Sequence, residues 1–251
     1  MLGLCSITFR DKTVDEVIAL VKEAELDAIE WGSDIHVPET DLSNAKVVAK
    51  KMAHANLIAS SYGTYYKLGQ FMDFTPYLEV ASILGVSTLR VWAGVKGSLD
   101  TDQEARQQIV FDAQRIAKDA AEAGLTISLE YHANTLTDTP KSTIALLHEI
   151  NAPNVLLYWQ PAEILSVDER IESLPELAPY ISNIHVFNWE HYRNRFPLAD
   201  AVENWKQYIA LIHKYSPHNQ TYLLEFAPGD DPVEGFLDSA ETLKRLVEVI
   251  K

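Results

Sequence analysis

The chain has a single cysteine and no long apolar run. Cys5 cannot form a disulfide within the chain, so we expect a reduced, cytoplasmic protein. The first ten residues lack the basic start and the apolar stretch of a secretory signal. No apolar segment approaches the roughly 20 residues that span a bilayer. We therefore expect neither secretion nor membrane insertion.

Basic residues are also scarce, with 21 Lys and Arg against 36 Asp and Glu and a net charge of -15. Such a surface repels a polyphosphate backbone, so we expect no nucleic-acid partner. No Gly-x-Gly-x-x-Gly turn follows the first apolar segment, which argues against a dinucleotide-binding sheet. A small-molecule substrate is the partner we expect, and a homodimer is compatible with the composition.

Short apolar segments alternate with amphipathic segments along the whole chain. The first helix is preceded by Thr13 with Glu16 three positions on, the spacing of a capping box. We predict eight strands, over Leu2 to Phe9, Ala28 to Trp31, Leu57 to Tyr62, Thr88 to Val91, Thr126 to Glu130, Val155 to Tyr158, Ile181 to Phe187 and Tyr222 to Glu225, with a long loop from Asn188 to Ala199. Eight strands each followed by a helix in 251 residues predict an α/β fold, a (β/α)8 TIM barrel that forms one domain over residues 1–251.

Four polar residues stand at the ends of the last four predicted strands: Glu130, Gln160, His185 and Glu225. Alternation along each strand directs their side chains toward the barrel axis, while the flanking apolar residues face the helices. The C-terminal ends of the strands are where such barrels hold their active sites. The sequence therefore predicts an enzyme with these side chains in one pocket.

Glu130 and Glu225 have the chemistry of a general base and a general acid with a metal ion between them. The alternative is that they form structural ion pairs with Arg90 or a lysine. His185 is a nitrogen ligand for a divalent transition metal or a core histidine bonded to a carbonyl group. Gln160 is a weak oxygen ligand or a hydrogen-bonding residue of a metal-free pocket.

Further residues are candidates for substrate binding at the mouth of the barrel. The segment from Ser61 to Lys67 is rich in hydroxyls and aromatic rings, which suit a polyol, although it could equally be a packed lid. Arg193 and Arg195 could hold a carboxylate or phosphate, or pair with Glu190 at the surface. The substrate-binding candidates are His36, Tyr62, Tyr65, Arg90, His132, Trp189 and Arg195. For His36 a surface-loop position is the alternative, and for Cys5 we expect a buried structural thiol.

At these residues the chain resembles the xylose isomerase-like barrels, in particular the sugar phosphate isomerase/epimerase group. The likeness rests on Leu-Glu-Tyr-His around Glu130, Ile-His-Val-Phe around His185 and Leu-Leu-Glu-Phe around Glu225, with Ser-Tyr-Gly-Thr-Tyr-Tyr and Arg-Val-Trp-Ala-Gly in support. It implies a divalent ion (Mn, Mg, Co or Zn) held by a glutamate, an aspartate, a histidine and a second glutamate. The aspartate position is Gln160 here, in Gln-Pro-Ala-Glu, which implies weaker metal binding.

The resemblance implies a metal-assisted isomerase or epimerase of a small sugar or sugar phosphate, with the glutamate pair acting on a cis-enediolate. A dehydratase of the inosose dehydratase kind is the second enzyme hypothesis, because it uses the same enolate and then expels hydroxide. The third hypothesis is a non-catalytic carbohydrate-binding barrel that has lost its metal through the change at Gln160. Endonuclease IV shares the superfamily, but its trinuclear zinc site needs more histidines than this rim offers, and the acidic surface opposes DNA.

Overall fold

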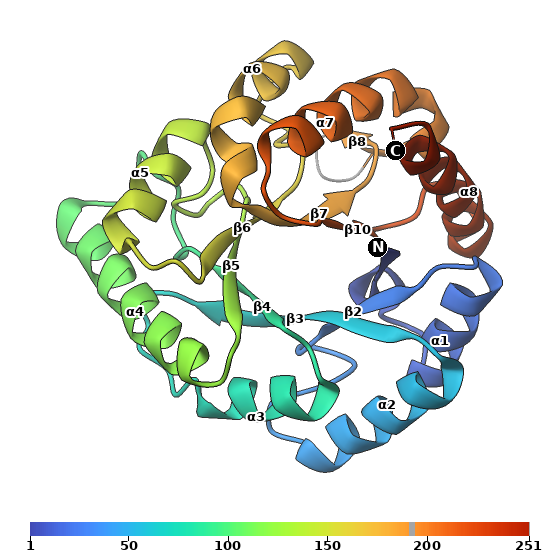
Figure 1. Cartoon of the computed structure of the whole chain (residues 1–251), viewed down its shortest axis with the longest axis horizontal. Helices are drawn as coiled ribbons and strands as arrows, with labels where there is room; N and C mark the ends of the chain where they lie inside the picture. The colour runs from blue at the N-terminus through green and yellow to red at the C-terminus, as the bar shows by residue number, and fades with distance from the viewer. Residues whose placement is uncertain (191–193, 251) are drawn as a thin grey trace.

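The computed structural model describes residues 1–190 and 194–250. Within these residues, eight parallel strands close into a barrel in the order β1-β10-β7-β6-β5-β4-β3-β2 (Figure 1). The barrel strands are β1 (Leu2–Cys5), β2 (Ala28–Gly32), β3 (Ile58–Lys67), β4 (Thr88–Trp92), β5 (Thr126–Glu130), β6 (Val155–Trp159), β7 (Ile181–Val186) and β10 (Thr221–Leu224). The predicted (β/α)8 TIM barrel is confirmed. Arg193 lies outside the described residues.

The helices surround the barrel as an outer ring (Figure 1). They are α1 (Val14–Glu23), α2 (Leu42–Ala55), α3 (Thr75–Leu84), α4 (Gln103–Glu122), α5 (Pro140–Ile150), α6 (Val167–Leu177), α7 (Val202–Tyr215) and α8 (Pro232–Ile250). The predicted capping box opens α1, because Thr13 accepts from the backbone N–H of Glu16 and the Glu16 carboxylate accepts from that of Thr13. Among the described residues, none of these helices is both long and apolar enough to cross a membrane.

Side-chain alternation on the strands separates an apolar layer from a polar interior. Ile127 and Leu129 of β5 are fully buried in the apolar core between strands and helices. Glu130 and His185 come together from β5 and β7, which fits the predicted inward orientation. The polar end of the barrel therefore collects its functional side chains from several strands at once.

Three predicted segments differ from the structure by more than a one-residue shift at a strand end. The third strand, predicted to end at Tyr62, continues to Lys67 as β3, so the predicted rim segment from Ser61 to Lys67 is strand. The first strand stops at Cys5, and Ser6–Phe9 forms a 3-10 helix, so the predicted strand over those four residues is wrong. The hydroxyl of Ser6 accepts the backbone N–H of Gly32 at 3.0 Å, where a continuing strand would have offered a carbonyl. The predicted loop from Asn188 to Ala199 contains a short antiparallel pair, β8 (Trp189–Glu190) and β9 (Asn194–Arg195).

Packing against a distant residue accounts for that hairpin. The Trp189 ring lies 5.1 Å from the Phe226 ring, and the guanidinium of Arg195 lies 4.3 Å from the same ring. Phe226 follows β10, so the contact joins segments that are separated in sequence. The residue pattern within the segment from Asn188 to Ala199 therefore could not predict the hairpin.

Candidate active site

Three of the predicted site residues meet inside the polar end of the barrel. Glu130 ends β5, His185 lies on β7 and Glu225 follows β10 directly. One side-chain donor atom from each lies within 4.8 Å of the others. His185 Nδ1 is 3.5 Å from Glu225 Oε2 and 4.0 Å from Glu130 Oε1. All three side chains are buried, so the tertiary structure concentrates charge where water is excluded.

Gln160, the fourth predicted metal ligand, joins the same cluster. It follows β6, and its Oε1 lies 3.2 Å from His185 Nδ1. The amide therefore faces the same ring nitrogen as the two glutamates. The four residues at the ends of β5, β6, β7 and β10 converge on one point, as the strand pattern predicts.

Glu30 is a further member of the cluster that the sequence analysis did not single out. It lies on β2, is fully buried, and its Oε2 lies 3.0 Å from His185 Nε2. The hydroxyl of Tyr158 also donates to Oε2. The sequence did contain a signal for this residue. Glu30 is the one ionisable residue in the apolar strand Ala28–Gly32, and strand alternation places it on the same face as Ala28, toward the barrel axis.

Arg90 connects two of the three carboxylates. Its Nε donates to Glu30 Oε1 at 2.7 Å, and its Nη1 donates to Glu130 Oε2. The guanidinium is 1% exposed and lies 5.5 Å from the Tyr65 ring and 5.9 Å from the Tyr158 ring. The ion-pair alternative considered from the sequence thus holds for Glu130, whereas Glu225 faces His185 instead.

Gly63 of β3 makes room for this ion pair. A Cβ atom at this position would lie 2.6 Å from Arg90 Nη2 and 2.6 Å from Glu30 Oε1. Contacts that short do not occur between unbonded atoms of these kinds, so a larger residue would displace the pair. The glycine in Ser-Tyr-Gly-Thr is therefore a packing requirement of the charged cluster.

The three ionisable centres have unequal pKa values. Burial by itself would raise the pKa of Glu30, but the charges of Arg90 and His185 and the hydrogen bonds from His185 and Tyr158 hold it well below its usual value. Burial raises the pKa of Glu225, and the negative charge of Glu130 raises it further against the opposing effect of His185. Burial would lower the pKa of His185, yet Glu225 and Glu30 outweigh this and raise it.

The donor set fits a divalent metal ion. Glu30, Glu130 and Glu225 with Arg90 leave two net negative charges when His185 is neutral, and one divalent cation neutralises them. Separations of 3.2 to 4.0 Å from His185 Nδ1 to the three oxygens are near those that an ion with bonds of ~2.1 Å imposes, about 3.0 to 3.5 Å between neighbouring ligands. The residues that would hold the ion are Glu130, Gln160, His185 and Glu225.

Tyr65 and His132 lie near this cluster. The Tyr65 ring covers Arg90, and its hydroxyl accepts from Arg10 Nη2 at 2.8 Å. His132 stacks on Trp92 with ring centroids 4.7 Å apart, and its Nδ1 lies 2.6 Å from the Ala133 carbonyl oxygen. A carbonyl oxygen only accepts, so Nδ1 donates in this contact, and the neutral form of His132 has its lone pair on Nε2.

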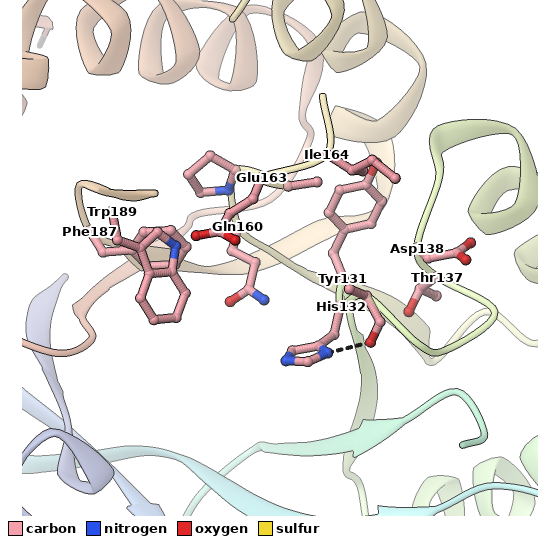
Figure 2. A pocket seen from close by; sticks show the side chains of 12 residues that line it. Tyr131, His132, Thr137, Asp138, Gln160, Glu163, Ile164, Phe187 and Trp189 are labelled. Atoms are coloured by element: carbon pink, nitrogen blue, oxygen red, sulfur yellow. Dashed lines mark hydrogen bonds between the residues drawn. The ribbon is translucent and has the colours of Figure 1, made fainter. Parts of the chain in front are cut away.

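A hollow beside the cluster is shared by His132, Gln160 and Trp189. Figure 2 shows the Gln160 amide between the His132 ring and the pair formed by Phe187 and Trp189. The loops after β5, β6 and β7 supply its walls. Arg195 pairs with Trp189 in the β8–β9 hairpin, and its side chain lies over the Phe226 ring and lines the neighbouring surface depressions.

Two predicted substrate-binding residues have their polar atoms engaged by the protein itself. His36 Nδ1 lies 3.1 Å from Ser6 Oγ, and Nε2 lies 3.1 Å from the Lys12 carbonyl oxygen. Tyr62 is fully buried and its hydroxyl donates to the Val37 carbonyl at 2.6 Å. His36 is absent from the cluster of Glu130, His185 and Glu225, and the Tyr62 ring packs 6.4 Å from the Tyr77 ring of α3.

Comparison with known proteins gives concordant matches. A family model described as the xylose isomerase-like TIM barrel matches residues 18–246. A 3-dehydroshikimate dehydratase of Bacillus anthracis is 28% identical over 200 residues, which cover 74% of this chain and 71% of that protein.

Several solved structures share the fold. The probable 3-DHS dehydratase of petrobactin synthesis from Bacillus anthracis superimposes with a TM-score of 0.79 at 21% identity, covering 97% of this chain and 98% of the other. A xylose isomerase-like barrel protein from Mycobacterium smegmatis in complex with magnesium gives 0.76 at 15%, covering 100% and 97%. A D-psicose 3-epimerase gives 0.73 at 13%, covering 99% of each chain. At these identities the superpositions establish the fold alone.

Proposed function

The chain belongs to the xylose isomerase-like TIM barrel family, and from that premise we propose that it is a metal-assisted dehydratase of a small hydroxylated carbonyl compound. The dehydratase of Bacillus anthracis at 28% identity supports a substrate like 3-dehydroshikimate, a cyclic ketone with hydroxyl groups and a carboxylate. This reverses the order of the two enzyme hypotheses drawn from the sequence. The reason is that Glu130 and Glu225 have different hydrogen-bond and charge partners.

The observation that carries the proposal is the unequal environment of the two carboxylates. Arg90 Nη1 donates to Glu130, whereas Glu225 lies beside His185 and has a raised pKa. Exchange of a proton between opposite faces of a substrate needs two carboxylates that both gain and lose a proton. Elimination of water needs only one such group. A site with one ion-paired and one basic carboxylate is suited to elimination.

Glu225 is the base in this proposal. Its carboxylate takes the proton from the carbon next to the substrate carbonyl, and the C–H electron pair becomes a carbon–carbon double bond as the neighbouring C–O bond breaks. The protonated Glu225 then returns its proton to the departing hydroxide, so one water leaves and the carboxylate is restored. A divalent ion held by Glu130, Gln160, His185 and Glu225 would supply Lewis-acid polarisation of the carbonyl group.

Neighbouring residues prepare Glu225 for this role. The buried setting that raises its pKa makes it a stronger base than a solvated carboxylate. Arg90 fixes the orientation of Glu130 through a charge-assisted hydrogen bond, and the Tyr65 ring lies 5.5 Å from the guanidinium. His132 offers an Nε2 lone pair in the adjoining hollow, which suits an acceptor for a substrate hydroxyl.

Product analysis tests the proposal. The purified protein, loaded with Mn²⁺ or Mg²⁺, is incubated with 3-dehydroshikimate and with a panel of ketoses, and the products are measured by mass spectrometry. A product lighter by one water, absent with Glu225→Gln, is the expected result. A product of unchanged mass identifies an isomerase or epimerase instead and overturns the dehydratase assignment.

The isomerase or epimerase remains the second candidate function. It is favoured by the fold likeness to D-psicose 3-epimerase and by the short separation of the donor atoms of Glu130 and Glu225. If this candidate is correct, a ketose in deuterated water gains solvent deuterium at the carbon next to its carbonyl. A protein that binds a sugar but turns over neither substrate class fits the third hypothesis, a non-catalytic carbohydrate-binding barrel.

A further inference from the structure

Glu30 is a buried carboxylate to which the proposed chemistry assigns no role. It lies on β2 and is 0% exposed. Three donors surround it: Arg90 Nε at 2.7 Å, His185 Nε2 at 3.0 Å and the Tyr158 hydroxyl. They come from β4, β7 and β6, so half of the barrel strands contribute to this one group. Burial of a carboxylate costs desolvation energy even when it is hydrogen-bonded, so we expect Glu30 to have a functional role.

The contacts of Glu30 argue against a role as metal ligand. Oε1 accepts from Arg90, and Oε2 accepts from both Tyr158 and His185. A metal ion at Glu30 would have to displace at least one of these donors. Cys5 Sγ lies within 4.8 Å of the Glu30 and His185 donor atoms, but burial and the nearby carboxylates raise its pKa and keep it a thiol.

The position of Glu30 determines what His185 can do. A neutral imidazole carries one N–H, and that N–H faces an acceptor. With the proton on Nε2 it donates to Glu30, and the lone pair on Nδ1 then faces Glu130, Glu225 and Gln160. With the proton on Nδ1, a lone pair would face the Glu30 carboxylate and an N–H would occupy the proposed ion position. Glu30 therefore selects between the two tautomers.

We propose that Glu30 is a positioning residue that holds His185 as the Nε2–H tautomer with Nδ1 directed at the metal site, and that Arg90 and Tyr158 hold Glu30 in place. The proposal rests on the metal-assisted function proposed above. It explains why Gly63 leaves space for the Arg90 and Glu30 pair, since a Cβ there would lie 2.6 Å from both. A second layer of hydrogen bonds that orients a histidine ligand commonly alters metal affinity by 10- to 100-fold when it is removed, an order-of-magnitude expectation.

Calorimetric titration with Mn²⁺ tests the proposal on the intact chain. Glu30→Gln keeps the size of the side chain but removes its charge, and we expect the Mn²⁺ dissociation constant to rise about 10- to 100-fold. Cys5→Ala is the matched control, because Cys5 Sγ also lies within 4.8 Å of the Glu30 and His185 donor atoms, and we expect unchanged affinity. A folded Glu30→Gln protein with wild-type affinity, or loss of binding in Cys5→Ala, overturns the proposal.

Glu30→Gln leaves Arg90 with less negative charge beside it and could prevent folding. Tyr158→Phe is the milder variant, because it removes one donor to Glu30 and no charge. We expect it to fold, by circular dichroism, and to bind Mn²⁺ several-fold more weakly. Unchanged affinity in a folded Tyr158→Phe protein overturns the proposal.

Nitrogen NMR of the Mg²⁺-loaded, ¹⁵N-histidine-labelled protein gives a readout that a merely structural role would not move. We expect the proton of His185 on Nε2, strongly shifted downfield by the carboxylate, and a smaller shift in Tyr158→Phe. A His185 proton on Nδ1 overturns the proposal.

The role of Glu30 and the dehydratase function would be overturned by different results. Glu30-dependent metal binding without any turnover leaves the proposal standing and overturns the dehydratase. Wild-type protein that does not bind Mn²⁺ or Mg²⁺ overturns the proposal, because there is then no metal site for His185 to serve.

Discussion

His185 Nδ1 lies 3.5 Å from Glu225 Oε2, and both side chains are buried at the polar end of the barrel. Burial raises the pKa of Glu225, and the nearby carboxylates of Glu225 and Glu30 raise that of His185, so both groups hold a proton more readily than they would in water. A divalent ion binds the deprotonated forms of both. Protons and metal therefore compete for the same two groups.

Thermal stabilisation by metal should increase with pH. The pKa of Glu225 is raised above 4.5 and that of His185 above 6.5. A folded-state pKa above the unfolded value stabilises the folded protein at low pH, and this contribution is lost as pH rises through the folded pKa. A metal ion restores the lost stability. We expect a larger Mn²⁺-induced rise in Tm at about pH 8 than at about pH 5. Equal shifts at both pH values would contradict the competition.

Glu225→Gln and Glu130→Gln should differ in stability although both lose activity. Glu225→Gln removes the base and should lower kcat by roughly 10² to 10⁴. Its free energy of unfolding should stay near the wild-type value, because the substitution removes a carboxylate whose burial is poorly compensated. Glu130→Gln takes a charged acceptor from Arg90 and should lower that free energy by about 1–3 kcal/mol. Urea denaturation measures both, and a reversed order would show that the carboxylate roles are misassigned.

Gly63→Ala should disturb the charged cluster without changing any charge. The added Cβ lies 2.6 Å from Arg90 Nη2 and from Glu30 Oε1, so the pair must move. Overpacking of this kind lowers the free energy of unfolding by about 1–3 kcal/mol. We also expect weaker Mn²⁺ binding, because Glu30 contacts His185. A variant with wild-type denaturation and affinity would show that the backbone of β3 yields freely.

Gln160→Asp should strengthen metal binding. Gln160 Oε1 faces the same His185 nitrogen as the two glutamates but contributes no charge. An aspartate would add one negative charge to the ligand set, and we expect the Mn²⁺ dissociation constant to fall by roughly tenfold, since affinity follows ligand charge. Calorimetry of both proteins measures this, with Gln160→Asn as the neutral control of the same length. An aspartate variant that binds no better than the asparagine variant would exclude Gln160 from the ligand set.

Cys5 should be inert in the native protein. It is fully buried in β1, and burial together with the charges of Glu30 and Glu225 raises its pKa well above 9.0. The reactive thiolate is therefore absent at neutral pH. We expect no reaction with a thiol reagent in buffer and complete reaction in guanidinium chloride. Native labelling at the unfolded rate would show that the strand opens readily.

The sequence by itself determined the order of the elements and which faces of the strands are polar. Alternation from Thr126 to Glu130 and from Ile181 to Val186 fixes which side chains face the axis, because the repeat of a strand is a local property. Since parallel barrel strands end at one rim, the strand pattern alone is enough to place Glu130, His185 and Glu225 together. The match of residues 18–246 to the family confirms the resemblance carried by the same motifs.

Only the tertiary structure decided which charges are paired. Arg90 joins Glu30 of β2 to Glu130 of β5, and those partners are 60 and 40 residues away in sequence. The inward face of Glu30 was readable from its strand, but its partners were not, because closure of the barrel sets which inward side chains meet. His36 and Tyr62 show the same limit, since their contacts with Lys12 and Val37 arise from how loops and helices fold over the strands. Strand periodicity is local, whereas the pairing of buried charges depends on distances across the closed barrel.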